Sequence, residues 1–283
     1  MTLTELAPAK LNLTLDVGAR RPDGYHDITS IMHSVALCDR LTLRETGSGQ
    51  LSLACQGAEL PTGPENLVWR AAETFFRETG LICPGIDMQL EKHIPSQAGL
   101  GGGSSDAAAA LRGLRRLYAP SLPDEALEQM AARVGSDVPY CVRGGTALAQ
   151  GRGERLTRLP GLRGCCFVIV KPDLACSTAA MYRQLDAITI QARPDSAAMI
   201  RALEQGDPEA VCRLVGNVFE QALPADCEVF TIRRRLLALG AGAACMTGSG
   251  SAVMGLFLRP EAARAAAEAL RADFPLTWFA PSV

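Results

Sequence analysis

A cluster of glycines followed by two serines and an aspartate is the segment of this sequence that most clearly indicates chemistry. Residues 92–110 read KHIPSQAGLGGGSSDAAAA, with four glycines between positions 99 and 103. We expect these glycines to take positive φ and to let the backbone lie flat against a ligand. Ser104, Ser105 and Asp106 are of N-cap type, and the alanines favour a helix. A glycine turn that opens a helix directs unpaired N–H groups at one point, so the segment predicts binding of a phosphate compound.

Two well-known phosphate loops do not fit this segment. No lysine follows Gly103, which excludes the GxxxxGK[ST] pattern, and no apolar strand of a βαβ unit precedes the loose GxGxxG match. The competing interpretation is a glycine-rich turn that only caps a helix. Four glycines in five residues disfavour it, because each glycine beside a helix costs about 1 kcal/mol relative to alanine.

A lysine and an amide occupy one face of an expected strand near the N-terminus. Lys10 and Asn12 in APAKLNL are two residues apart, so both side chains point away from Leu11 and Leu13. A single lysine in a strand is most often exposed to solvent. A cation and an amide projecting together from an apolar strand make a better candidate for a functional site.

Asp137 is the candidate acid of the sequence VGSDVPYC. It follows a Gly-Ser turn and precedes an apolar segment that contains Pro139. One interpretation is a helix cap. The other is a half-buried carboxylate that accepts a proton from a hydroxyl group, provided that a nearby cation keeps it ionised. Lys10 is a candidate for that cation, although sequence spacing does not show whether the two residues meet.

Strands and helices are interleaved along the chain, which predicts an α/β or α+β protein of two domains with a boundary near residue 155. Alternating or continuous apolar runs predict the strands, and apolar residues with helical spacing predict the helices. The expected strands cover residues 3–17, 31–45, 51–55, 86–91, 145–150 and 165–171, with a strand–turn–strand over 245–258. The expected helices cover residues 65–79, 104–118, 123–134, 178–186, 195–204, 207–221, 228–238 and 260–272.

Composition narrows the class of protein. The 283 residues include 48% hydrophobic residues and carry a net charge of −2, so no global field recruits nucleic acid or an anionic membrane. The ten cysteines form no CxxC, and we expect them to be reduced and mostly buried. No apolar run approaches the roughly 20 residues of a membrane span, and no signal peptide precedes Leu6. We therefore expect a cytoplasmic protein.

Two further segments carry weaker signals. The polar RRPD turn is followed by Gly24, Tyr25 and His26, and an exposed Tyr-His pair would offer a stacking face and a polar edge. The second glycine turn, TGSGSA at 247–252, lies between two expected strands and could be a simple hairpin turn. Neither segment identifies a function by itself.

Taken together and in this order, three of these segments resemble the motifs of the GHMP kinases, which include galactokinase and the homoserine, mevalonate and phosphomevalonate kinases. They are PAKLNL around Lys10, PSQAGLGGGSSDAA at 95–108 and TGSGSAV at 247–253. RRPDGYH at 20–26 and GSDVPYC at 135–141 further resemble the branch whose acceptor is 4-diphosphocytidyl-2-C-methyl-D-erythritol. The resemblance spans nearly the whole chain.

The resemblance implies a fold and a reaction. The fold would be α+β, with a ribosomal-S5-like N-terminal domain over residues 1–155, a ferredoxin-like C-terminal domain over residues 156–283, and the substrates in the cleft between them. The reaction would be ATP-dependent phosphorylation of the 2-hydroxyl of that acceptor, in the non-mevalonate pathway to isoprenoid precursors. ATP and Mg²⁺ would be required, with small molecules as the only substrates, and the protein would be a monomer or a weak homodimer. No protein ligand is assigned to Mg²⁺, which phosphates and water would hold.

The resemblance also implies roles for single residues. One departure is that the family's usual Asn-Asp-Leu-Glu is replaced here by Asn217, Val218, Phe219 and Glu220. Lys10 and Asp137 would be the catalytic pair. The nucleotide would contact Asn66, Leu67, Pro95, Gly99, Leu100, Gly101, Gly102, Gly103, Ser104 and Ser105. The acceptor would contact Asn12, Tyr25, His26, Lys92, Thr178 and Tyr182.

Two other functions remain to be weighed. One is another kinase of the same family, such as a mevalonate-type or homoserine kinase, but neither of those acceptors has a base for Tyr182 and the GYH segment to stack on. The other is a nucleotide-binding sensor without activity. The presence of both Lys10 and Asp137 in intact motifs argues against a sensor.

Overall fold

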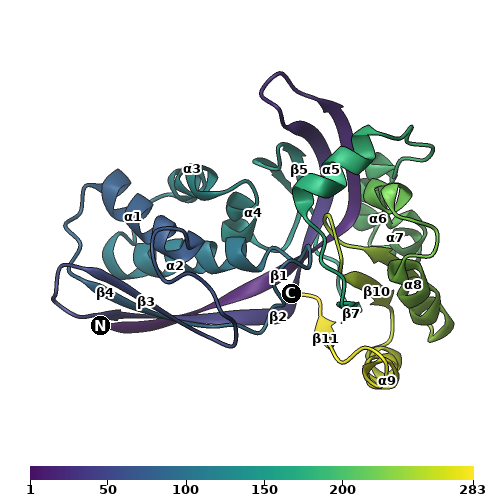
Figure 1. Cartoon of the computed structure of the whole chain (residues 1–283). Helices are drawn as coiled ribbons and strands as arrows, with labels where there is room; N and C mark the ends of the chain where they lie inside the picture. The colour runs from purple at the N-terminus through teal and green to yellow at the C-terminus, as the bar shows by residue number, and fades with distance from the viewer. The chain divides into compact units, whose positions relative to one another are not determined.

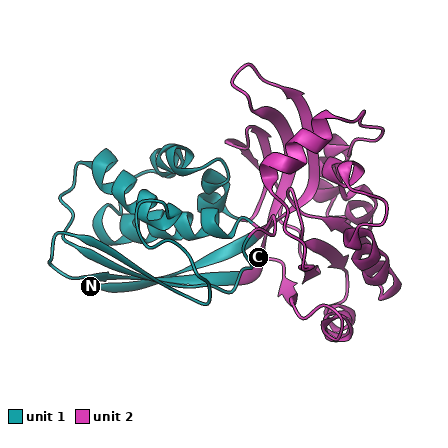
Figure 2. Cartoon of the chain, in the orientation of Figure 1, with its two compact units in different colours: residues 1–9, 38–96, 101–144 teal, residues 10–37, 97–100, 145–283 magenta.

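The computed structural model describes residues 1–283 and divides into two compact units, coloured separately in Figure 2. Two long strands, β1 (Thr2–Arg20) and β2 (His26–Glu45), each contribute a segment to both units. None of the helices is both long and apolar enough to cross a membrane. Unit 1 comprises residues 1–9, 38–96 and 101–144, and unit 2 comprises residues 10–37, 97–100 and 145–283.

Unit 1 is a sheet with its helices packed on one side (Figure 1). β2 pairs antiparallel with β4 (Ile86–Glu91), which pairs parallel with β3 (Leu51–Gln56). The register of β2 and β4 places Leu41 opposite Leu90 and Leu43 opposite Met88. All four side chains are buried, because alternation directs them to the face of the sheet that forms the core. The helices are α1 (Leu67–Thr79), α2 (Gly102–Tyr118), α3 (Asp124–Val134) and α4 (Val138–Arg143).

α2 is the central helix of unit 1. The alanine run at 107–110 is fully buried, together with Leu111 and Leu114. Small side chains let neighbouring elements approach closely, and at Gly113 an added Cβ would stand 2.5 Å from the Leu43 side chain of β2. The core of unit 1 therefore holds the helix that the glycine segment opens.

Unit 2 contains a four-stranded antiparallel sheet in the order β11-β7-β10-β9. Its interior strand β7 is the apolar run Cys166–Val170, and every residue of it is buried, as expected for a strand with a neighbour on each side. The remaining strands are β9 (Ala243–Met246), β10 (Val253–Phe257) and β11 (Thr277–Pro281), and the packed helices are α8 (Glu228–Ala238) and α9 (Pro260–Arg271).

The rest of unit 2 surrounds the inner segments of β1 and β2. β2 pairs with β5 (Thr146–Gly151), β5 pairs with β6 (Arg155–Arg158), and β1 pairs at Thr14 and Leu15 with the short β8 (Gly216–Asn217). The helices here are α5 (Thr178–Asp186), α6 (Ser196–Gln205) and α7 (Pro208–Leu214).

The expected mixed α+β architecture is confirmed, with several local corrections. The helix expected over 207–221 ends at Leu214 and is followed by β8 and a 3₁₀ turn, Val218–Ala222. After α7 the chain pairs with β1, and the side-chain amide of Asn217 donates to the carbonyls of Met246 and Gly248, contacts that a continued helix would not make. α4, β6 and β11 were not expected. All ten cysteines are free; four are buried and six half-buried. The division at residue 155 stays a prediction.

Candidate active site

The phosphate segment begins α2 two residues earlier than expected. Gly101 is left-handed at φ 68°, the helix starts at Gly102, and the Ser105 N–H donates to the Gly101 carbonyl at 2.9 Å. The N–H groups of the first turn have no acceptor inside the helix and remain available to an anion. Positive φ is confirmed at Gly99 and Gly101, but the expectation was wrong for Gly102 and Gly103, which are helical.

Close packing explains the glycines that are helical. A Cβ at Gly102 would stand 3.1 Å from the Ile94 side chain and 3.3 Å from the Lys92 ammonium nitrogen. A Cβ at Gly103 would stand 3.6 Å from the side chain of Leu67, which begins α1. The first turns of α1 and α2 are therefore neighbours, as the predicted nucleotide roles of Leu67 and Gly103 require.

The serines after the glycines do not cap α2. No side chain caps its N-terminus, so the expected N-cap role of Ser104, Ser105 and Asp106 was wrong. The Ser105 hydroxyl is buried and donates to the Pro8 carbonyl at 2.7 Å, whereas Ser104 is half-buried. Ser104 is thus more accessible to a ligand than Ser105. Pro95, in the segment before the turn, is half-buried.

Asn66 is the N-cap of α1, with both ends of its amide occupied. Its Oδ1 accepts the Val68 N–H at 2.9 Å, and its Nδ2 donates to the Pro61 carbonyl at 2.8 Å. The glutamate before it lies outside the helix, although a glutamate was expected in the first turn. Asn66 can shape the start of α1 through these bonds, and its contact with the nucleotide stays a prediction.

Lys92 is enclosed by two carboxylates. Its ammonium donates to Asp39 and, at 2.5 Å, to Asp106, and its side chain is only 5% exposed. Asp39 also accepts the backbone N–H groups of His93 and Ile94. Lys92 therefore lies within unit 1, beside the first turn of α2. Its predicted contact with the acceptor stays untested.

Asp39 and Asp106 were not identified from the sequence. The available signal was alternation, because Asp39 shares the inward parity of Leu37, Leu41 and Leu43 along β2. An acid at an inward position of a half-buried strand calls for a cationic partner.

Asp137 lies half-buried immediately before α4 and makes no capping hydrogen bond. The proline at the next position but one, Pro139, removes one of the N–H donors that a cap would satisfy. Asp137 therefore stands at the N-cap position of α4, as the helix-cap interpretation held, but its carboxylate does not serve as a cap. The carboxylate remains a candidate base, and its pairing with Lys10, which belongs to the other unit, stays a prediction.

Lys10 is a buried cation held by Asn12. The Lys10 side chain is in unit 2, the residue is 4% exposed, and its Nζ donates to Asn12 Oδ1 at 2.7 Å. Asn12 Nδ2 in turn donates to the Ser30 hydroxyl at 2.7 Å. The expected exposure of a single strand lysine does not apply here. Asn12 orients the lysine, and its contact with the acceptor stays a prediction.

The two glycine turns meet within unit 2. The Lys10 N–H donates to the carbonyl of buried Leu100 at 3.0 Å, and the Ala252 N–H donates to the Ala98 carbonyl at 3.2 Å. At Gly99 an added Cβ would stand 2.2 Å from the Thr247 carbonyl oxygen. The glycine segment is thereby pinned to β1 on one side and to residues 247–252 on the other.

The turn at 247–252 does connect two antiparallel strands, as the hairpin interpretation held, but it has additional partners. Asn12 Oδ1 accepts the Gly248 N–H at 3.0 Å, and the Thr247 hydroxyl accepts the Asn12 N–H at 3.0 Å. One amide side chain thus holds Lys10 and this turn together.

Asn217 and Glu220, in the segment that departs from the family pattern, support the same turn. Asn217 Nδ2 donates to the carbonyls of Met246 and Gly248, both at 2.8 Å, and Glu220 Oε1 accepts the Met246 N–H at 2.8 Å. Val218, which replaces the usual acid, is fully buried. Asn217 and Glu220, the two polar residues that this segment shares with the family pattern, are therefore the ones that hydrogen-bond the backbone of the turn.

The acceptor-side residues form an aromatic group in unit 2. Tyr25 is 54% exposed, with the Arg152 guanidinium 5.1 Å from its ring centroid. His26 is buried instead of exposed, which corrects the expected exposed pair. Its ring stacks on Tyr182 at 4.9 Å, and its Nε2 bonds Asp186 at 2.8 Å. Because those two rings are in contact, they cannot hold a base between them in this arrangement.

Thr178 begins α5 and lies exposed. Its hydroxyl is 2.9 Å from that of Ser249, within the second glycine turn. α5 therefore carries Thr178 to the turn and Tyr182 to His26, so three of the residues predicted to bind the acceptor are linked through one helix.

Two glycine turns joined to a buried lysine, with one turn opening a buried helix, are combined here in a mixed α+β fold. The family model of the GHMP kinases N terminal domain matches residues 66–145, and that of the GHMP kinases C terminal domain matches residues 199–276. The chain belongs to the GHMP kinases.

Two curated relatives carry the name of one kinase of that family. The chain is 45% identical to the 4-diphosphocytidyl-2-C-methyl-D-erythritol kinase of Pelotomaculum thermopropionicum, over 96% of this chain and 94% of that protein. It is 44% identical to the kinase of the same name from Geobacillus kaustophilus, over 90% and 88%. A crystal structure of 4-(cytidine 5'-diphospho)-2C-methyl-D-erythritol kinase matches with a TM-score of 0.81 and 38% identity, covering 98% of both chains.

A crystal structure of homoserine kinase from Cytophaga hutchinsonii matches with a TM-score of 0.79, covering 99% of this chain and 95% of that one, at 18% identity. That likeness concerns the fold alone. The predicted family, the fold class and the prediction of a small-molecule kinase are confirmed.

Proposed function

We propose that this protein transfers the γ-phosphoryl group of ATP to the 2-hydroxyl of 4-diphosphocytidyl-2-C-methyl-D-erythritol, in the non-mevalonate pathway to isoprenoid precursors. The observation that carries the proposal is the glycine turn with positive φ at Gly99 and Gly101, which opens α2 in a chain 45% identical to a kinase named for that acceptor. As a GHMP kinase the protein uses ATP as the phosphoryl donor.

The nucleotide would bind where α1 and α2 begin. The free N–H groups of Gly102, Gly103 and Ser104 and the positive end of α2 favour the phosphates. Leu67, beside Gly103, offers an apolar contact toward the adenine. Pro95, Leu100 and Ser105 would shape the turn from behind, because the last two are buried.

Mg²⁺ would enter with the nucleotide. The chain brings together no group of three or more His, Cys, Asp or Glu side chains suited to a metal ion, so the donor set fits an ion held chiefly by phosphate oxygens and water. When bound, the ion neutralises charge on the phosphates.

The chain's own residues would supply positioning, a cation and a base. Phosphoryl transfer requires little covalent help from the protein, so orientation and charge stabilisation dominate. Lys10, held by Asn12, would stabilise the charge that develops on the transferred group. Asp137, with no capping bond, would orient the acceptor hydroxyl and take its proton.

The acceptor's cytosine would be recognised by the group around Tyr25. An exposed aromatic face next to the His26 backbone suits stacking together with hydrogen bonds to the edge of the base. Tyr182 and Thr178 belong to the same side, through α5. We also place the reaction in the cytoplasm and the protein as a monomer or weak homodimer, with no nucleic acid or membrane partner.

A panel of acceptors tests this proposal. In a coupled assay of ADP release with ATP and Mg²⁺, we expect turnover of 4-diphosphocytidyl-2-C-methyl-D-erythritol and none of methylerythritol phosphate, mevalonate or homoserine. A site built around polar contacts with a base rejects compounds that leave those groups unpaired, by factors that reach about 10⁴. Comparable turnover of mevalonate or homoserine would overturn the proposed acceptor.

Tyr25→Ala should raise KM for the cytidine-bearing acceptor by roughly five- to a hundredfold, the equivalent of about 1–3 kcal/mol of stacking. KM for ATP should stay within about twofold, because the change removes binding on the acceptor side and leaves the chemistry intact. Steady-state kinetics with each substrate varied in turn measures both. A defect confined to ATP would contradict the assignment of Tyr25.

A further inference from the structure

Three buried charged side chains lie close to the first turn of α2, and none of them is assigned a step in the proposed phosphoryl transfer. They are Asp39 on β2, Lys92 just after β4 and Asp106 in the second turn of α2, and all belong to unit 1. The Lys92 ammonium bridges the two carboxylates. It also stands 3.3 Å from the position of a Cβ at Gly102, the first residue of α2. We call these three residues the charge cluster.

The two carboxylates of the charge cluster are not equally satisfied. Asp39 is fully buried and accepts two backbone N–H groups as well as the lysine. Asp106 is 2% exposed, and its Oδ1 is the one buried side-chain oxygen or nitrogen in the chain without a hydrogen-bond partner. A buried carboxylate left with an unpartnered oxygen is costly as an anion and much less so as a neutral acid.

The balance of charges in the cluster also favours a neutral Asp106. One ammonium facing two buried carboxylates leaves one negative charge in excess unless a proton is retained. Burial, and the neighbouring charge of Asp39, raise the pKa of Asp106 to about 8, although Lys92 opposes the shift. Lys92 stays charged, since despite burial its two carboxylate partners raise its pKa.

We propose that the charge cluster is a positioning device for the nucleotide phosphates, in which Asp106 retains a proton so that the base of the turn carries no net negative charge. Lys92 and Asp39 form the ion pair that fixes the start of α2 against the sheet. A neutral Asp106 still accepts the hydrogen bond from Lys92, and it does not repel the negatively charged phosphates. The proposal rests on the nucleotide site of the proposed function and on no property of the acceptor.

The proposal predicts that nucleotide affinity falls at high pH. Above the pKa of Asp106 the cluster gains a negative charge directly behind the phosphate-binding N–H groups. One additional negative charge close to a partly buried anion site weakens binding of the anion on the order of tenfold. The raised pKa of Asp106 also lowers the free energy of unfolding as pH rises from about 4 to about 8. Over that window the folded chain binds more protons than the unfolded chain.

Other titratable and charged groups face Asp106 from the elements packed against it. Lys92 and Asp39 face it from the β4 and β2 sides, and Cys55 faces it from β3. Burial raises the pKa of the Cys55 thiol above its ordinary value, so it stays neutral near pH 8. On α2 itself, Arg112 is paired with Glu5.

Asp106→Asn tests the proposal, because asparagine has the shape of the neutral acid and cannot ionise. Binding of ADP with Mg²⁺ is measured by calorimetry from pH 6.5 to 9.5, without acceptor. We expect wild-type affinity to fall on the order of tenfold between pH 7 and 9.5, and the affinity of Asp106→Asn to stay flat and near the wild-type value at pH 7. Titration of the nucleotide itself cancels in the comparison.

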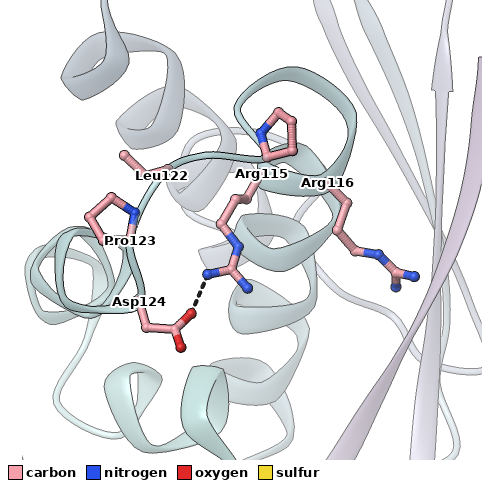
Figure 3. Close-up of a pocket in the computed structure, with 6 residues that line it drawn as sticks. Arg115, Arg116, Leu122, Pro123 and Asp124 are labelled. Carbon is pink, nitrogen blue, oxygen red and sulfur yellow. Dashed lines mark hydrogen bonds and ion pairs between the residues drawn. The ribbon is translucent and has the colours of Figure 1, made fainter.

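Asp124→Asn is the matched control. Asp124 is the first residue of α3, exposed and paired with Arg115 of the last turn of α2, in a hollow lined by Arg116, Leu122 and Pro123 (Figure 3). Both arginines there are already paired with carboxylates, and the residue has no place in the proposed site. We expect Asp124→Asn to follow the wild-type pH profile.

Either of two results would overturn the proposal. One is an Asp106→Asn profile that declines with pH as the wild-type profile does. The other is a folded Asp106→Asn protein that has lost most of its ADP affinity at pH 7, which would show that the anion is needed. Wild type that binds no nucleotide at any pH would instead contradict the proposed function.

A second measurement does not depend on how the variant folds. In wild-type protein labelled with ¹³C at aspartate carboxyl groups, one buried carboxyl should titrate between pH 7 and 9. If every aspartate titrates below pH 6, Asp106 is ionised at neutral pH and the proposal fails.

Discussion

Replacing Asp137 with asparagine should lower kcat by a factor of about 10² to 10⁴, the range expected for loss of a general base. The carboxylate is half-buried, precedes α4 without capping it, and is therefore available to a hydroxyl group. Asparagine preserves the shape but cannot take a proton. ATP affinity should remain within about twofold, because the interaction removed is made in the transition state.

Single-turnover kinetics with saturating ATP and acceptor measures this effect, with nucleotide binding followed separately. Asp124→Asn, in the same unit but exposed at the start of α3, is the control for the loss of one aspartate. If Asp137→Asn keeps more than about half of the wild-type turnover, positioning alone suffices and the base is not Asp137.

Gly99→Val should lower kcat/KM for ATP by about 10²-fold or more, the cost of displacing a bound substrate by about 1 Å. Gly99 has φ 74°, which a β-branched residue rarely adopts. A Cβ there would also stand 2.2 Å from the Thr247 carbonyl, so the two glycine turns would have to separate. The displaced turn would carry Leu100 away from its bond to Lys10.

Circular dichroism and thermal melting establish whether the Gly99→Val protein is folded, and a titration with ATP gives the affinity. Gly161→Val is the control, because Gly161 has an ordinary φ and open space around it. Wild-type ATP affinity and turnover in folded Gly99→Val would show that the turn only caps a helix.

Local rules in the sequence predicted most elements and the chemistry of the first glycine turn. Helical spacing of apolar residues and the left-handed Gly80 placed α1, and strand alternation placed β2 and β4. The glycines followed by alanines predicted a turn opening a buried helix, because both signals act within a few residues. The order of three short motifs was sufficient to assign the family.

Only the tertiary structure decided which side chains these elements bring together. Gly102 is a glycine because of the space beside Lys92, and not because of φ; nothing near it in sequence indicates this. Asn12, Thr247 and Gly248 form one network across more than 230 residues. Lys92 lies between Asp39 and Asp106, a pairing that no pattern in the sequence predicted, and its expected contact with the acceptor stays a prediction.

The physical reason is common to these cases. Periodicity and turn propensity depend on neighbours in the chain, whereas burial of a charge depends on what the fold packs against it. An inward-facing acid such as Asp39 signals that a cation is needed, but only the pairing of β2 with β4 and the packing of α2 determine that the cation is Lys92 and that Asp106 shares it.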